Sequence, residues 1–204
     1  RIKNKEKNII SLRRQYRMDE KICKLINKYF YDNNLITDES VKKSQKKYPK
    51  ILNDNLIVVD TASANPFCVY QPYGYSRTNT LHACAIRNLC IYLQNNKIIE
   101  DITSVGVATP YKAQQVLLSD LMKEWSLNDV VTGTVHRYQG DQKDIMIFDI
   151  ADSEGTEPSY LIKSASKFDD SSKLLNVAFS RPKNILIVFA NIKYLQERLP
   201  PTAI

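Results

Sequence analysis

The side chains that could do chemistry in this chain are arginines, and the most informative of them is Arg181. It follows an apolar helical pattern over Leu174–Phe179 and precedes Pro182, which cannot continue a helix without losing a backbone donor. The pattern predicts a short helix that ends by Arg181 and leads into a buried strand. The commonest explanation of such an arginine is a surface cation that lies against the negative end of a helix dipole.

A second group of arginines surrounds a glutamine and a tyrosine in the segment Leu12–Met18. The residues after it carry apolar side chains on one helical face, so we expect a helix from near Met18 to about Asp32. The formal net charge of +7 is compatible with a polyanionic partner. Much of this charge lies in residues 1–7 and 42–50, where a solvated segment is the default explanation.

Composition limits the class of protein. A chain of 204 residues with 43% hydrophobic content suits one domain with a full core. No apolar run approaches the roughly 18 residues that a membrane span needs, and no apolar signal core follows the first charges, so we expect a cytoplasmic or nuclear protein without a membrane partner. The four cysteines lack metal-ligand spacing and there are only two histidines, so we expect no metal site and reduced thiols.

The elements that position these arginines are predicted from apolar runs that alternate with helical patterns. We expect strands near residues 56–60, 104–109, 130–135, 144–150 and 185–190, and helices near 79–95, 113–125 and 192–199. The intervening segments are expected to be a lysine-rich loop over 37–55 with a short strand near 48–52, a turn-rich stretch over 61–76, and a long polar loop over 151–172.

This alternation predicts an α/β fold with a mostly parallel sheet covered on both faces. Sites in such sheets lie beyond the carboxyl ends of the strands. We therefore expect Thr109–Tyr111, Thr134–Gly140 and, through its preceding helix, Arg181 at that edge.

Four segments, taken together, carry a family resemblance. They are Gln15–Met18, Ala108–Gln114, Gly133–Gly140 and Asn176–Arg181. Their order and spacing resemble the second RecA-like motor domain of superfamily 1 helicases, in the branch that includes the RNA helicase of nonsense-mediated decay and related DNA helicases. The resemblance covers Ser11 to Ala190 and implies a RecA-like three-layer α/β/α fold.

The resemblance implies that residues 1–204 form half of a composite site. In such helicases ATP and Mg²⁺ lie between two RecA-like domains, and the first domain supplies the phosphate-binding loop. None of the five glycines here is spaced for that loop, so the metal and most of the nucleotide would be held by a first domain outside this chain. We expect the chain to be a piece of a longer protein and to be inactive by itself.

The resemblance also implies roles for individual residues. Arg17 and Arg181 match the arginines that reach the γ-phosphate, and Tyr16 matches the residue that stacks on adenine, with Gln15 positioning the turn. Gly140 and Gln142 lie where the family commonly has Gln-Gly-x-Glu, whose carboxylate holds the ribose. Gln142 is uncharged, so this contact is weakened.

The remaining matched residues concern single-stranded DNA or RNA. By resemblance, Thr109, Pro110 and Tyr111 form one contact turn, and Thr134 with His136 forms another. A structural alternative stays open for each of two residues. His136 would be a structural histidine with its hydrogen bonds made within the fold, and Tyr111 would be a half-buried aromatic residue of a turn. One functional alternative also stays open: a non-catalytic RecA-like module that binds nucleic acid or a protein, with Gln142 and Pro182 marking lost motor function.

Overall fold

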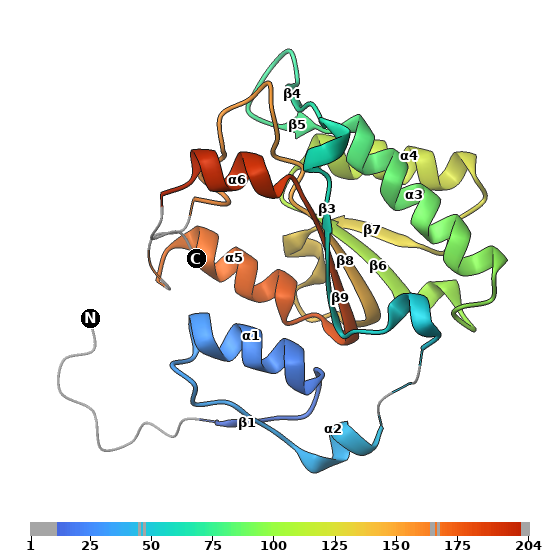
Figure 1. The fold of residues 1–204 in the computed structure, drawn as a ribbon, viewed down its shortest axis with the longest axis vertical. Coiled ribbons are helices and arrows are strands. Elements are labelled where there is room, and N and C mark those ends of the chain that lie inside the picture. Colours follow the sequence, from blue (N-terminus) through green and yellow to red (C-terminus); the bar gives the residue numbers. More distant parts are fainter. Residues whose placement is uncertain (1–11, 45, 47, 164–165, 167, 201–204) are drawn as a thin grey trace.

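The computed structural model describes residues 12–44, 46, 48–163, 166 and 168–200. A sheet of five strands lies at its centre, in the order β3-β9-β8-β6-β7, and every neighbouring pair is parallel. The strands are β3 (Leu56–Asp60), β6 (Val105–Thr109), β7 (Val131–Thr134), β8 (Lys143–Asp149) and β9 (Pro182–Ala190). The strands expected from apolar runs are therefore present, and they form one parallel sheet (Figure 1).

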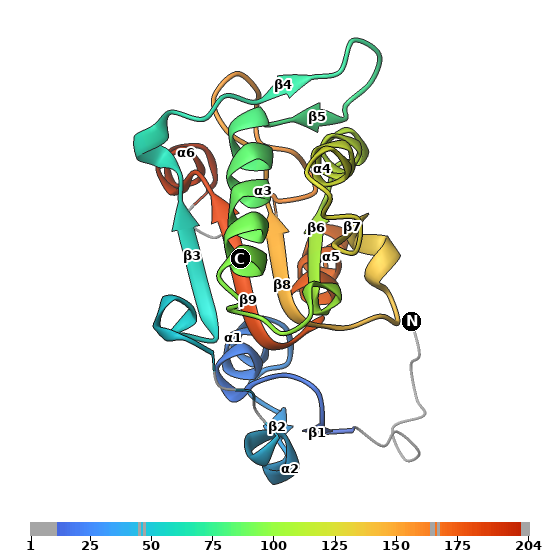
Figure 2. The same cartoon turned by 90° about the vertical axis from the view of Figure 1, so that its right-hand side faces the viewer.

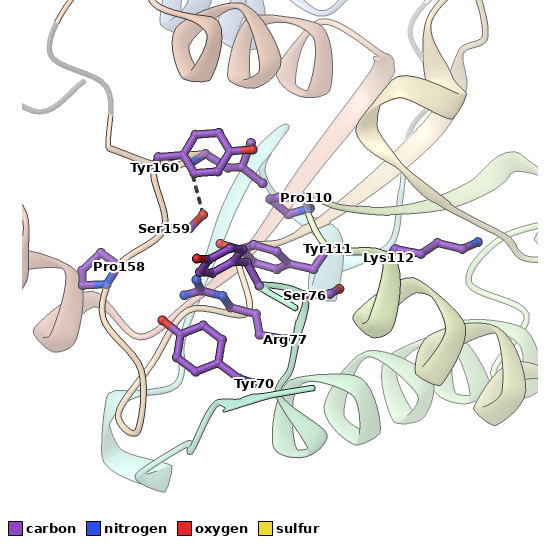
Figure 3. Close-up of a pocket in the computed structure, with 11 residues that line it drawn as sticks. Tyr70, Ser76, Arg77, Pro110, Tyr111, Lys112, Pro158, Ser159 and Tyr160 are labelled. Atoms are coloured by element: carbon purple, nitrogen blue, oxygen red, sulfur yellow. Dashed lines mark hydrogen bonds between the residues drawn. The ribbon is translucent and has the colours of Figure 1, made fainter. Parts of the chain in front are cut away.

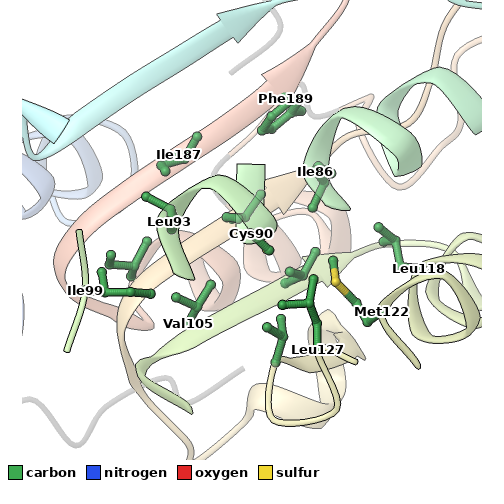
Figure 4. Packing of buried hydrophobic residues seen from close by; sticks show 14 of the residues in the cluster. Ile86, Cys90, Leu93, Ile99, Val105, Leu118, Met122, Leu127, Ile187 and Phe189 are labelled. Atoms are coloured by element: carbon green, nitrogen blue, oxygen red, sulfur yellow. The ribbon is translucent and has the colours of Figure 1, made fainter. Parts of the chain in front are cut away.

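Helices cover both faces of this sheet, which explains why its central strands are apolar throughout. On one face α3 (Thr80–Asn95) and α4 (Lys112–Glu124) pack against alternate strand residues such as Ile145 and Ile187. Figure 4 shows side chains from these helices and from the strands meeting in this core. On the other face α1 (Glu20–Phe30), α5 (Asp170–Phe179) and the short 3-10 helix Val135–Tyr138 enclose the remaining strand residues. The expected RecA-like three-layer α/β/α fold is confirmed.

Because all five strands run the same way, the sheet has an amino edge, where strands begin, and a carboxyl edge, where they end. In Figure 2, α1 and the small elements β1 (Arg14–Gln15), β2 (Ile36–Thr37) and α2 (Glu39–Lys43) lie at the amino edge. The hairpin β4 (Val69–Tyr70) and β5 (Arg77–Thr78) lies at the carboxyl edge. The helix α6 (Ile192–Arg198) follows the last strand.

Three expectations about elements were wrong. Lys50–Leu52 forms a 3-10 helix rather than a strand, because Pro49 turns the chain and its carbonyl accepts a bond from the Leu52 amide at 2.8 Å. The segment around it also contains β2 and α2, so it is not one loop. Helix α5 begins at Asp170, so the last residues of the expected long loop, 170–172, are helical.

The expected place of Arg181 was also wrong. Arg181 directly precedes β9, so it lies at the amino edge of the sheet and not at the carboxyl edge. The strand starts at Pro182, three residues earlier than expected, because a strand's first residue tolerates the missing proline donor. Among the described residues, no helix combines the length and the apolar character needed to cross a membrane.

Candidate nucleotide and nucleic-acid site

Gln15 organises the turn at the amino edge. Its Oε1 accepts hydrogen bonds from the amides of Arg17 at 2.8 Å and Met18 at 2.9 Å. Its Nε2 donates to the carbonyl of Met18 and to Oγ1 of Thr37, both at 2.8 Å. Because these four bonds fix the backbone around it, the turn holds Tyr16 outward, with 67% of its surface exposed.

Arg17 and Arg181 meet at the end of α5. Nη1 of Arg17 donates to the carbonyl of Ser180 at 3.3 Å. Arg181 donates from Nε to the carbonyl of Val177 at 3.0 Å and from Nη2 to Oγ of Ser180 at 2.9 Å. Two residues separated by most of the chain therefore place their guanidinium groups around one serine, and both stabilise the unsatisfied carbonyls of a helix C-terminus.

Among the described residues, no acidic side chain balances these two cations. In the part of the chain that the structure describes, neither Arg17 nor Arg181 forms an ion pair with a carboxylate. Burial and the neighbouring charge of Arg17 lower the pKa of the Arg181 guanidinium below its ordinary value. Two half-buried like charges without a counterion make this position favourable for an anion.

Gly140 and Gln142 also lie at the amino edge, in the turn that leads into β8, so the expected place of Gly140 at the carboxyl edge was wrong. Both are exposed, and Gly140 has a φ of 93°, which suits glycine in this turn. The amide of Lys143 donates to the carbonyl of Arg181 at 3.3 Å. The structure therefore brings the turn that contains Gly140 and Gln142 to the same edge as the two arginines.

The residues expected to contact a nucleic acid lie at the carboxyl edge, but they differ in exposure. Thr109 is fully buried at the end of β6, and Tyr111 is only 3% exposed. Pro110 and Thr134 are half-buried, and His136 is exposed. The side chains of Thr109 and Tyr111 are thus not accessible to a strand, whereas the other three are.

Tyr111 is buried because it belongs to a cluster that the sequence did not reveal. Its hydroxyl donates to Asp152 Oδ2, while Nη1 of Arg77 donates to Asp152 Oδ1 at 2.7 Å. The Arg77 guanidinium lies 4.9 Å from the centre of the Tyr111 ring and 4.8 Å from that of Tyr70. Burial is the largest influence and opposes the charge of Arg77, but Asp152 together with the neighbouring Tyr111 and Tyr70 outweighs it, so the pKa of Arg77 is raised. No spacing rule links residues 75 positions apart, so only the fold shows this ion pair.

A pocket of about 380 Å³ opens beside this cluster (Figure 3). Its walls come from the β4–β5 hairpin, the turn 110–112 and residues 158–161. Two tyrosines at the pocket are largely in solvent, Tyr75 with 86% and Tyr160 with 74% of its surface exposed. Both tyrosines lie in segments that were expected to be loops. The clustering of tyrosines over residues 70–75 was the signal that could have indicated a site.

Within the described ranges, no group of three or more His, Cys, Asp or Glu side chains is arranged to hold a metal ion. The side chains suited to a ligand are cationic at the amino edge and aromatic at the carboxyl edge. The first set suits phosphate oxygens, and the second suits a planar ring.

Comparisons with known proteins place this fold in a family. A family model described as an AAA domain matches residues 1–193. The bovine DNA replication ATP-dependent helicase/nuclease DNA2 is 25% identical, over 98% of this chain and 20% of its own length. The DNA polymerase alpha-associated DNA helicase A of Saccharomyces cerevisiae is 28% identical, over 89% of this chain and 27% of its own length.

Among solved structures, the C-terminal domain of a possible DNA helicase from Lactobacillus plantarum is similar, with 13% identity and a TM-score of 0.47. The match covers 92% of this chain and 91% of that domain. The chain spans only 20% to 27% of the two curated relatives. Because the family model matches almost the whole chain, the chain belongs to the AAA-domain family, and its resemblance to superfamily 1 helicases is confirmed.

Proposed function

We propose that this chain is the second RecA-like motor domain of an ATP-dependent helicase or translocase that moves along single-stranded DNA or RNA. The observation that carries the proposal is the pair of guanidinium groups, Arg17 and Arg181, that converge on Ser180 and have no carboxylate partner in the described part of the chain. The helicase names of the relatives support it. Both arginines would act on a nucleotide held mainly by a first RecA-like domain.

At the amino edge, the proposed chemistry is stabilisation of phosphoryl transfer. Arg17 and Arg181 present fork-shaped donors that match phosphate oxygens and neutralise charge that develops in the transition state. The Nη1 group of Arg181 has no acceptor among the described residues, so it is free to bind one. Mg²⁺, held by the first domain, would supply further neutralisation of the phosphates.

The exposed ring of Tyr16 is proposed to stack on the adenine base, next to the arginines on the same turn. Gly140 and Gln142 would lie near the ribose. Gln142 can accept a hydrogen bond from a hydroxyl through its carbonyl oxygen but offers no charge. We therefore expect recognition of the sugar to contribute less here than recognition of the phosphates and the base.

At the carboxyl edge, Pro110, Thr134 and His136 are proposed to contact a single strand. Tyr111 would contribute by holding the 109–111 turn in place through Asp152, and not through its own ring. Backbone groups of this turn and of Thr134 would bind phosphates without selecting a sequence. Closure of the two domains around ATP would then move this edge along the strand.

The test is single-strand-stimulated ATP hydrolysis by the whole protein. Arg181→Ala and Arg17→Ala should each lower turnover at least about tenfold, and up to about 10³-fold if they act as arginine fingers, while strand binding is largely kept. Arg13→Ala and Arg14→Ala are matched controls, because both lie in the same segment and both are exposed. They should leave turnover unchanged.

Unchanged turnover in Arg181→Ala and Arg17→Ala would refute the assigned site. Absence of turnover in the wild-type protein, with strand binding intact, would instead favour the non-catalytic module. The isolated chain should show no turnover, because it has no glycine-rich phosphate loop of the type Gly-x-x-x-x-Gly-Lys-Ser/Thr.

A further inference from the structure

We infer that the pocket at the carboxyl edge receives an unpaired nucleobase of the bound strand, so that this domain grips the strand by stacking as well as through phosphates. This inference rests on the proposed function and deepens it. The pocket lies next to Pro110, which the proposal already places against the strand. Its volume of about 380 Å³ falls within the roughly 300–1,000 Å³ typical of small-ligand sites.

Hydrogen bonds between the segments that form the pocket hold its walls in place. The amide of Ala113, at the start of α4, donates to Oγ of Ser76 in the hairpin at 2.9 Å. The amide of Cys68 donates to the carbonyl of Glu154 at 2.7 Å, and Oγ of Ser153 donates to the carbonyl of Pro66 at 2.8 Å. The first bond joins the hairpin to α4. The wall of residues 158–161 is joined to the hairpin by Asp152, which pairs with Arg77 of β5 and accepts from the amide of Ser159 at 3.0 Å, so the pocket is a preformed feature of the fold.

The floor is a neutralised cation flanked by aromatic rings. Arg77 is 3% exposed and pairs with Asp152, and its guanidinium lies between the rings of Tyr70 and Tyr111. Nε of Arg77 is buried and has no hydrogen-bond acceptor in the described structure. Because Arg77 and Tyr111 are buried, the ring available to one more planar group is that of Tyr70, which is 44% exposed, and a nucleobase supplies such a group.

The rim exposes the aromatic surface that a base would cover. Tyr75 and Tyr160 line the opening, and Figure 3 shows Tyr160 across the pocket from Tyr111 and Tyr70. Lys112 lies at the same opening and is exposed. The combination of aromatic faces with a cation, and with no carboxylate among the described lining residues, suits a base attached to a phosphate backbone.

The experiment compares two strands with the same backbone. Affinity of the whole protein is measured by fluorescence anisotropy for an ordinary single-stranded oligonucleotide and for an oligonucleotide of equal length made of abasic nucleotides. Tyr75→Ala and Tyr160→Ala should weaken binding of the ordinary strand by about tenfold and leave binding of the abasic strand unchanged. Both side chains are mostly exposed, so neither change threatens the fold.

Two variants serve as controls. Tyr160→Phe keeps the ring and should keep the affinity. Tyr73→Ala removes a tyrosine that is 99% exposed on the same hairpin but does not line the pocket, so it should have no effect.

The outcomes separate this inference from the proposed function. Equal affinity of the wild type for both strands, or equal loss on both strands in the alanine variants, would overturn the base pocket while strand-stimulated ATP hydrolysis still supports the motor domain. A wild-type protein that neither binds a strand nor hydrolyses ATP would overturn both.

Discussion

Arginines occupy both edges of the sheet, but their surroundings are opposite. At the carboxyl edge Arg77 is buried, pairs with Asp152 and lies between two tyrosine rings. At the amino edge Arg17 and Arg181 are half-buried, lie close to each other and have only helix carbonyls and a hydroxyl as partners within the described chain. The difference teaches that charge compensation, rather than burial or residue type, separates an arginine that holds the fold from one for which we propose a ligand.

The physical reason is the cost of an uncompensated charge. A buried guanidinium must have its counterion within the fold, because water cannot solvate it. A pair of like charges that lacks such a counterion is stabilised when an external anion arrives, and part of the binding free energy is this relief. The amino edge is thus proposed to gain stability from its ligand, whereas the carboxyl edge is stable without one.

The largest expected effect tests this contrast through stability. Arg77→Met should lower the free energy of unfolding by about 3–5 kcal/mol, because it leaves Asp152 buried without its cation. Arg181→Met should leave the free energy of unfolding within about 0.5 kcal/mol of wild type, because it removes a repulsive neighbour of Arg17. Urea unfolding of both variants provides the measurement. A similar loss in the free energy of unfolding in both variants would mean that the two arginines do not differ in charge compensation.

The next effect concerns the turn that carries Tyr16 and Arg17. Gln15→Ala removes four hydrogen bonds and should reduce ATP turnover about tenfold or more, through misplacement of the turn. Gln15→Glu keeps the two accepted bonds but cannot donate to Met18 or Thr37, so it should fall between wild type and Gln15→Ala. Steady-state kinetics of both variants would show this order. An alanine variant with normal turnover would show that the turn is held by other contacts.

A smaller effect is expected for Tyr16, because we propose that it contacts the adenine base and not the reacting phosphate. Tyr16→Ala should raise KM for ATP about five- to tenfold and change kcat little, since stacking of this kind contributes about 1–1.5 kcal/mol. Tyr16→Phe keeps the ring and should behave as wild type. A fall in kcat with KM unchanged would contradict the assignment of Tyr16 to the adenine.

The smallest effect is a pH dependence at the amino edge. Hydrogen bonds from Ser40, with a further bond from Arg14, lower the pKa of Asp38 to about 2. Because the folded pKa lies below the ordinary value of 3.8, the carboxylate stabilises the fold above pH 4, and this stabilisation is lost as the pH falls toward 2. In Asp38→Asn, the free energy of unfolding should depend slightly less on pH between pH 4 and pH 2. The substitution should not alter the structure at the carboxyl edge. The same pH dependence of unfolding in the variant and the wild type would show that Asp38 does not contribute to stability in this range.

Several features of the fold were predictable from local patterns. Continuous Val and Ile runs identified all five strands of the sheet, and the position of Pro182 identified the end of α5 before Arg181. Errors arose in the shortest elements. The strand β2 is held by pairing with the distant β1, and the 3-10 helix at Lys50–Leu52 is held by a single bond from Leu52 to Pro49. Such short elements leave no periodic signal, because they contain less than one repeat of either pattern.

The sequence by itself determined the α/β class, the strand residues and the four helicase motifs, since each depends on neighbours along the chain. Only the tertiary structure decided that Arg181 lies at the amino edge, that Arg17 joins it at Ser180, and that Tyr111 turns inward to Asp152. Exposure and charge compensation are set by residues far apart in sequence. The pairing of Arg77 with Asp152, which forms the floor of the pocket, therefore became visible only once the two loops were brought to the same edge.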